Sequence, residues 1–270
     1  MQNLKDARGN RRFYILGLPF DSQALKDHRL ADNPNEAFDC SQYNPAAKIY
    51  DRRAKCFVEY YKRTPSENRD FIDAWEVGNE VNGEWADEDY QKDLPPETKG
   101  KPEKTIEKIN RLINFITDRD RKPLMLTVSY MPNCGDRTAN QMSEWIKNIP
   151  QSMVNELDYV LISYYEDKCD YKVLSESDIT SKVLEPLKTK FPKQFIAFGE
   201  IGYSVGKGEP SKNRGDKTCY CSVKKTFCDE SQTGRKRTCK KSKISLMQRY
   251  YSYRPDYGLY VGGGFWWNGG

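Results

Sequence analysis

Two glutamates in this sequence could do chemistry because each directly follows an apolar, β-prone segment. Residues 72–77 are such a segment and lead into Gly78-Asn79-Glu80, while residues 195–198 lead into Gly199-Glu200 far downstream. Two carboxylates presented by two strands suit cleavage of a glycosidic bond. One acid protonates the leaving oxygen, while the other attacks the anomeric carbon or activates a water there.

The final strand adds a third motif, Gly-Gly-Phe-Trp-Trp at residues 263–267. Together with Asn79-Glu80 and Gly199-Glu200, this motif resembles the pattern of a large clan of retaining glycoside hydrolases built on the TIM barrel. In that clan the acid/base Glu follows an Asn at the end of strand 4, and the nucleophile Glu ends strand 7. The resemblance therefore implies that Glu80 is the general acid/base and Glu200 the nucleophile, acting on a carbohydrate substrate without a cofactor.

The resemblance also implies contacts with the sugar and with the nucleophile. Asn79 would hydrogen-bond the sugar's 2-hydroxyl. Alternatively, Asn79 is a turn residue that caps the strand end. Tyr165 would hydrogen-bond Glu200 from the end of strand 6, although a packing role is equally open. Trp266 and Trp267 end strand 8, where the clan places a Trp under the sugar. We favour Trp267 for that platform, and Trp85 would line a leaving-group subsite or anchor its loop.

Three other residues have simpler interpretations. Glu76 is expected to be an interior ion-pair partner, and Glu84 to be a loop or subsite residue. His28 is the only histidine, so serine-histidine triads and histidine-rich metal sites have little to build on. We expect His28 to be a solvated loop residue and predict no metal site.

The elements that position these residues alternate along the chain. Apolar strands start near residues 13, 72, 124, 158, 195 and 259, and amphipathic patterns predict helices around residues 45–63, 106–116, 142–149, 179–187 and 243–253. This alternation predicts parallel β/α units. A doubly wound open sheet usually has a Gly-rich phosphate loop after an early strand, and residues 17–20 do not form one.

A closed barrel brings the ends of strands 4 and 7 to one opening, so it explains the pair Glu80 and Glu200 better than an open sheet does. We therefore predict an α/β fold, a (β/α)8 TIM barrel. Only one strand precedes the Glu80 strand where three are expected, so the barrel would lack strands 1 and 2 and the last helix, as a fragment would. Residues 1–270 are predicted to be a single catalytic domain with an insertion at about 207–243.

That insertion is strongly basic. It holds twelve Lys or Arg against four Asp or Glu, so it carries about +8 and the remainder of the chain about −3 of the total of +5. It lacks aromatic stacking residues in number and a recognisable nucleic-acid module. We predict a solvated loop and no nucleic-acid binding, with an anionic polysaccharide or a cell surface as the alternative contact.

Four of the eight cysteines also lie in the insertion, at Cys219, Cys221, Cys228 and Cys239. Cys-x-Cys followed by wide gaps is not the paired Cys-x-x-Cys spacing of a zinc ribbon. Disulfides that staple this polar segment are therefore favoured over a zinc site and over free thiols. Disulfides indicate an oxidising compartment, so we expect a secreted or extracellular protein.

Other classes of function remain as alternatives. No run of about eighteen apolar residues occurs, so no membrane span is predicted, and we expect a monomer. The competing hypotheses are a catalytically silent barrel that binds carbohydrate and an inactive fragment. The sugar, its linkage and endo or exo action are left open by the sequence.

Overall fold

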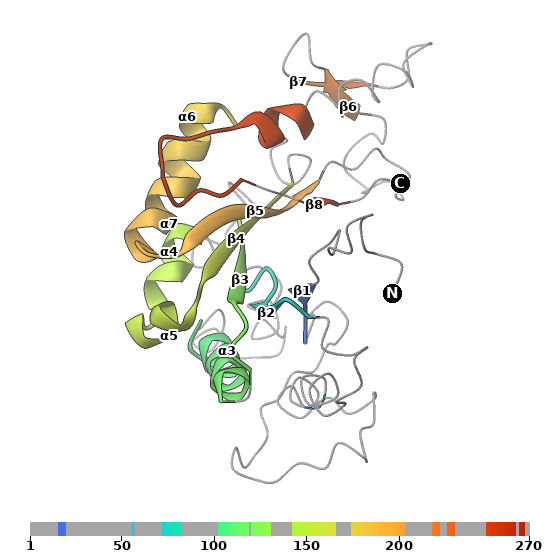
Figure 1. Cartoon of the computed structure of the whole chain (residues 1–270). Coiled ribbons are helices and arrows are strands. Elements are labelled where there is room, and N and C mark those ends of the chain that lie inside the picture. Colours follow the sequence, from blue (N-terminus) through green and yellow to red (C-terminus); the bar gives the residue numbers. More distant parts are fainter. Residues whose placement is uncertain are drawn as a thin grey trace, which may run out of the picture. The chain divides into compact units, whose positions relative to one another are not determined.

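Parallel strands alternate with helices in the computed structural model of this chain (Figure 1). The structure describes residues 16–19, 56, 72–82, 102–118, 120–130, 142–165, 174–202, 218–221, 226–229, 247–262 and 265–267. The main sheet contains β1 (Leu16–Gly17), β2 (Ala74–Gly78), β3 (Leu124–Ser129), β4 (Tyr159–Tyr165), β5 (Phe195–Gly202) and β8 (Phe265–Trp267), in the order β1-β2-β3-β4-β5-β8. Strand β1 pairs in parallel with β2, β2 with β3, and β5 with β8. The chain is thus part of a (β/α)8 barrel, which confirms the predicted fold class.

Most of the helices between the strands are those that the amphipathic patterns indicate. They are α3 (Pro102–Thr117), α4 (Met142–Trp145) with the 3-10 turn η5 (Ile146–Asn148), α5 (Gln151–Glu156), α6 (Glu176–Asp178), the π segment η6 (Ile179–Leu184) and α7 (Glu185–Lys190). Residues 247–252 are also helical, and of the predicted helix at 45–63 the described part is Cys56, which is helical and disulfide-bonded.

The chain divides into two compact units, Met1–Val128 with Trp145–Val160 and Ser129–Glu144 with Leu161–Gly270. In the first unit, α3 contacts β2 and α5. Ile109, Ile113 and Ile116 recur at helical spacing on α3 and are fully buried. Trp75 of β2 is buried as well, and its indole N–H donates to Asp120 at 3.0 Å. The apolar stripe of α3 therefore helps to hold the strand that leads to Glu80.

In the second unit, aromatic rings join the helical residues 247–252 to the strands. Tyr250 lies 5.3 Å from Phe198 of β5 and 6.4 Å from Tyr164 of β4, measured between ring centroids. Tyr253 and Tyr260 meet edge to face at 5.7 Å. Burial raises the pKa of Tyr260 to about 12, with a further contribution from Tyr253. Tyr260 therefore packs as a neutral ring at physiological pH.

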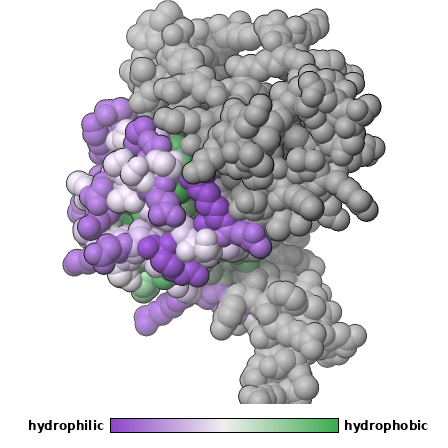
Figure 2. Space-filling model, turned by 90° about the horizontal axis from the view of Figure 1, so that it is seen from above, coloured by the Kyte–Doolittle hydropathy of each residue, from purple (hydrophilic) through white to green (hydrophobic). Residues whose placement is uncertain are grey.

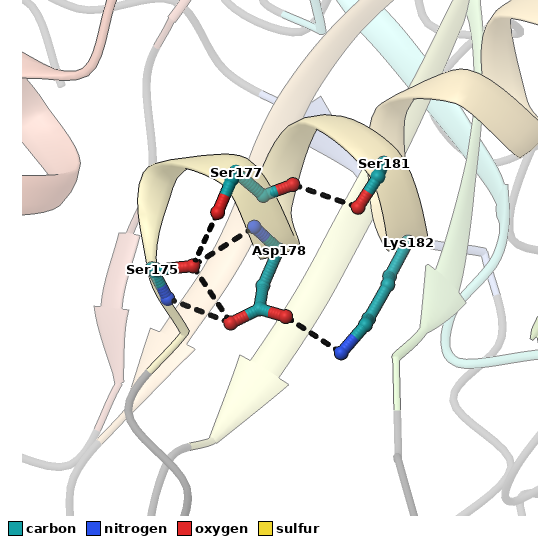
Figure 3. Close-up of polar contacts among 5 residues, drawn as sticks. All are labelled: Ser175, Ser177, Asp178, Ser181 and Lys182. Atoms are coloured by element: carbon teal, nitrogen blue, oxygen red, sulfur yellow. Dashed lines mark hydrogen bonds and ion pairs between the residues drawn. The ribbon is translucent and has the colours of Figure 1, made fainter.

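The segment from α6 to α7 begins with a capping box, drawn in Figure 3. The Asp178 N–H donates to the Ser175 hydroxyl at 3.0 Å, and the Ser175 N–H donates to the Asp178 carboxylate at 3.2 Å. Lys182 pairs with the same carboxylate at 2.6 Å. These contacts satisfy two backbone donors that a helix start leaves unpaired, so the sequence itself defines where this helix begins.

A proline explains why the middle of this segment is a π-helix. In an α-helix the ring of Pro186 would clash with the carbonyl oxygen of Lys182, four residues earlier. The N–H of Glu185 instead donates to the carbonyl of Thr180, five residues earlier. The wider turn accommodates Pro186 without ending the helix.

Two predicted elements differ from the structure. The helix predicted over 142–149 is present as α4 and η5, but Ile149 and Pro150 are extended and are followed by a separate helix, α5, which was not predicted. Strand β8 is also shorter than the predicted 259–267. Residue Tyr260 forms only an isolated bridge with Ile196, and Gly262 has a φ of +72°, which an extended strand does not allow.

The basic insertion is the third difference. The sequence predicts a solvated loop there, whereas the structure forms an antiparallel hairpin from β6 (Thr218–Cys221) and β7 (Thr226–Asp229). Thr, Tyr and Phe at these positions favour strands, although the segment around them is dominated by lysine and other polar residues. The organisation of residues 1–270 as one catalytic domain stays a prediction.

The described face that Figure 2 draws is largely polar. Figure 2 shows hydrophilic residues over most of the visible described face, with hydrophobic residues in small areas between them. Within the residues that the structure describes, no helix combines the length and apolar character needed to cross a membrane.

Candidate active site

Glu80 lies just beyond β2 in a backbone conformation that side chains rarely adopt. Its φ is 44°, and among the described residues it is the only one other than glycine with a positive φ. This left-handed conformation costs an ordinary residue about 1–2 kcal/mol, so the surrounding structure must hold it. The side chain is buried, with 3% of its surface exposed. Backbone strain of this kind collects at active sites and ligand clamps.

A β-bulge at the end of β2 contributes to this conformation. The register with β3 shifts between Glu76 and Gly78, so Val77 is an extra residue in the strand. A bulge bends its strand and changes the direction of the residues that follow. The N–H of Val81 then donates to the carbonyl of Thr127 at 3.2 Å, which ties the turn after β2 to β3. The bulge therefore fixes the backbone before Glu80, and the hydrogen bond of Val81 fixes the backbone after it.

The close approach within this turn requires glycine at position 78, and Gly78→Ala should lower stability. A Cβ at Gly78 would lie 2.5 Å from Cγ1 of Val81 and 3.2 Å from Cδ1 of Leu126. We expect the free energy of unfolding to fall by about 1–3 kcal/mol, as overpacking of a core does. Urea unfolding measures this change. Gly258→Ala is the matched control, because a Cβ there meets no atom within 4 Å. Equal midpoints for the two variants would contradict the prediction.

Asn79 presents a hydrogen-bond acceptor that nothing in the described structure uses. The residue is buried, and its side-chain Oδ1 has no hydrogen-bond partner among the described residues. A buried polar atom without a partner costs free energy of about 1–3 kcal/mol. The atom is thus suited to accept a hydrogen bond from a bound hydroxyl, and the predicted contact with a sugar stays a prediction.

Glu76 is buried beside Thr127, four positions before Glu80. The Thr127 hydroxyl donates to the Glu76 carboxylate in a buried hydrogen bond. From the sequence we expect Glu76 to form an interior ion pair, whereas the partner that the structure shows in this contact is the hydroxyl group of Thr127. This bond joins β2 to β3 close to the bulge, so it helps to set the position of the turn that carries Glu80.

Glu200 lies within β5, which continues two residues past the predicted strand end to Gly202, and it meets the predicted tyrosine. The Tyr165 hydroxyl, at the end of β4, donates to the carboxylate Oε2 of Glu200 in β5. A Cβ at Gly199 would lie 2.9 Å from the Cβ of Leu161, so glycine before the acid permits close packing of side chain against backbone between β4 and β5. The contact between Tyr165 and Glu200 that the resemblance implies is therefore present in the structure.

The neighbouring tyrosine does something different. Tyr164 is 2% exposed, and its ring lies 5.7 Å from that of Tyr130 and 6.4 Å from that of Tyr250. Alternation along β4 places Tyr164 and Tyr165 on opposite faces. Tyr164 packs in the aromatic cluster, while Tyr165 reaches the acid.

Removing the Tyr165 hydroxyl should lower activity without lowering stability much. Tyr165→Phe keeps the ring and removes one hydrogen bond to a carboxylate, an interaction of about 1.5–3 kcal/mol. We expect kcat/KM to fall by about 10- to 100-fold, because Glu200 loses the group that orients it. Tyr251→Phe removes the same hydroxyl from a ring that is 41% exposed and serves as the control. Equal kcat/KM values for both variants would contradict the predicted role.

The remaining predicted residues lie in β8 or outside the described residues. Trp266 and Trp267 belong to β8, where they pair in register with Ile201 and Gly202 of β5. Trp85, Glu84 and His28 fall outside the described residues. Stacking of Trp267 or Trp85 on a sugar stays a prediction.

Each unit thus brings together part of the predicted site. The first unit holds Asn79 and Glu80, and the second joins Tyr165 to Glu200. The approach of Glu80 and Glu200 to one sugar stays a prediction. Among the described residues, no group of three or more His, Cys, Asp or Glu could hold a metal ion. The bulge and the left-handed Glu80 were missed by sequence reasoning, although Gly78-Asn79 is a turn signal.

The sequence matches no protein-family model and no curated protein. Among solved structures, a thermostable mutant of a xylanase from Cellvibrio japonicus is similar to this chain, with a TM-score of 0.44 and 16% sequence identity. The similarity covers 80% of this chain and 58% of that chain. This chain therefore spans less than two thirds of the length of the xylanase structure that it matches.

Proposed function

We propose that this protein is a retaining glycoside hydrolase that cleaves O-glycosidic bonds of a poly- or oligosaccharide by double displacement. Glu80 serves as the general acid/base and Glu200 as the nucleophile. Asn79 accepts a hydrogen bond from the sugar's 2-hydroxyl, Tyr165 orients the nucleophile, and Trp267 is an apolar platform under the sugar. No cofactor takes part in these steps.

The observation that carries this proposal is the hydrogen bond from Tyr165 to Glu200. A hydroxyl that donates to a carboxylate stabilises its ionised form and fixes its orientation. An ionised, oriented carboxylate at the end of a strand is what a covalent nucleophile requires. The bond is made to one of the two carboxylate oxygens, Oε2.

Two features of the Glu80 turn add support. A strained backbone at a buried acid has no benefit for stability, and such strain persists where it serves a function. The unused acceptor on Asn79, directly before the acid, suits a ligand that carries hydroxyl groups. Sugars supply such donors at fixed positions around their rings.

The reaction then proceeds in two balanced steps. In the first, an oxygen of Glu200 forms a bond to the anomeric carbon while the glycosidic bond breaks, and Glu80 gives its proton to the departing oxygen. In the second, Glu80 takes a proton from a water molecule, whose oxygen attacks the same carbon and releases Glu200. Two inversions at one carbon give net retention.

The test is hydrolysis of a panel of glycans and aryl glycosides, with the anomeric configuration of the first product followed by NMR. We expect at least one substrate to be cleaved with retention. A retaining mechanism also requires the two carboxyl groups to lie about 5–5.5 Å apart, against about 6.5–9.5 Å for inversion. An inverted product would contradict the assigned roles. Binding of glycans without any cleavage would show a carbohydrate-binding barrel instead.

A further inference from the structure

The β6–β7 hairpin of the basic insertion places two cysteines directly opposite each other. Its register pairs Thr218 with Asp229, Cys219 with Cys228, Tyr220 with Phe227, and Cys221 with Thr226. Opposite residues of an antiparallel pair have Cα atoms about 4.5 or 5.5 Å apart, depending on the hydrogen-bonding pattern. A disulfide spans a Cα separation of about 4.4–6.8 Å. Both types of opposite pair fall within that range.

We propose that Cys219 and Cys228 form a cross-strand disulfide that holds this hairpin in the oxidised protein. The register also disfavours the other pairings within the hairpin. Cys221 is diagonal to Cys228, a relation with separations of about 7–8 Å. Cys219 and Cys221 are two positions apart on one strand, about 6.6–6.8 Å, at the upper limit for a bridge. The pairing follows from register alone and does not depend on the proposed hydrolase activity.

The hairpin has a physical need for such a bond. A two-stranded hairpin by itself is marginally stable in water, and the insertion around it carries twelve Lys or Arg against four Asp or Glu. Like charges in one short segment repel and favour an open chain. A disulfide between the strands restricts the open chain and so favours the paired state.

The bond forms by exchange with another disulfide, which is the oxidant. The thiolate of one cysteine attacks that disulfide, forms a mixed disulfide and displaces one thiol. The thiolate of the second cysteine then attacks the sulfur of the first and displaces the second thiol. The two cysteines together lose two protons and two electrons, and the oxidant is reduced to two thiols.

The experiment is disulfide mapping of the full chain, folded in a mixture of reduced and oxidised glutathione. Free thiols are alkylated under denaturing conditions, and the protein is digested without reduction. Trypsin separates the strands at Lys224 and Lys225, and chymotrypsin cuts after Tyr220, between the two cysteines of β6. We expect a peptide that carries Cys219 linked to one that carries Cys228. Dithiothreitol should abolish this signal.

Two variants sharpen the result. Cys221→Ser should keep the linked pair, whereas Cys228→Ser should lose it. Amide hydrogen exchange across residues 218–229 should become faster by on the order of tenfold or more on reduction, while exchange in β3 stays unchanged. Linkage of Cys228 to Cys221 or Cys239 would overturn the proposal. So would free thiols at both positions in the folded protein, or thiols that react only after zinc is removed by a chelator.

Discussion

Glu200→Gly should abolish glycan hydrolysis, with kcat/KM reduced by on the order of 10⁴-fold or more. The substitution removes the carboxylate that forms the covalent intermediate, and no other step can replace it. Steady-state rates on the best substrate of the panel measure the loss. Glu156→Gly is the control, because Glu156 is an exposed acid at the end of α5. Its activity should equal that of the unmodified protein.

Azide separates loss of the nucleophile from loss of folding. In Glu200→Gly the space of the removed side chain admits a small anion, which attacks the anomeric carbon in place of the carboxylate. A single displacement follows, so the product should be a glycosyl azide of inverted configuration, which NMR identifies. A variant that retains most of its activity would contradict the role of Glu200. A folded variant that makes no inverted azide adduct would contradict it as well.

Glu80→Asn should reduce the hydrolysis of natural glycans by about 10²–10⁴-fold, the usual contribution of general acid catalysis. Substrates whose leaving group needs no proton, such as dinitrophenyl glycosides, should still form the glycosyl-enzyme. Because Asn also cannot act as the base for water, that intermediate should accumulate and produce a burst of released phenolate. Azide should then attack the glycosyl-enzyme and give a product of retained configuration, opposite to that from Glu200→Gly.

The same substitution tests the strain at Glu80. Asn adopts a left-handed backbone more readily than Glu does, so the urea midpoint of Glu80→Asn should stay the same or rise. Glu156→Asn controls for the chemical change at a site without this conformation. Activity lost equally on natural and activated substrates would contradict the acid role. A large drop in the midpoint would show that Glu80 stabilises the fold.

Two strands illustrate what local sequence predicts well. Tyr159–Tyr165 and Phe195–Gly202 are strands close to where the sequence predicts them, although the second continues two residues past the predicted end at Glu200. Both are short apolar runs of β-branched and aromatic residues between polar segments, and such runs have few other stable conformations. The isoleucines at helical spacing also predict helix α3, although the helix begins at Pro102, before the predicted start near residue 106.

The errors arose where one residue decides between neighbouring conformations. Pro150 lies in extended backbone after η5 and directly precedes α5, a helix that the apolar stripe of residues 142–149 did not predict. Pro186 does not end its helix, because the wider turn of the π segment before it avoids the clash between the proline ring and the carbonyl of Lys182. A proline therefore has opposite consequences at two places, and the choice depends on how the helix around it packs.

The sequence by itself determined that the chain alternates strands with helices and that Glu80 and Glu200 lie close to the C-terminal ends of two strands. Both are consequences of apolar periodicity, which is a local property. Only the tertiary structure decided how those glutamates are held. The bulge at Val77 and the left-handed backbone of Glu80 depend on pairing with β3. Alternation along β5 places Glu200 on the same face as Phe198. Phe198 packs on Tyr250, whereas Glu200 accepts a hydrogen bond from Tyr165. Such contacts join residues distant in the chain, so no local pattern encodes them.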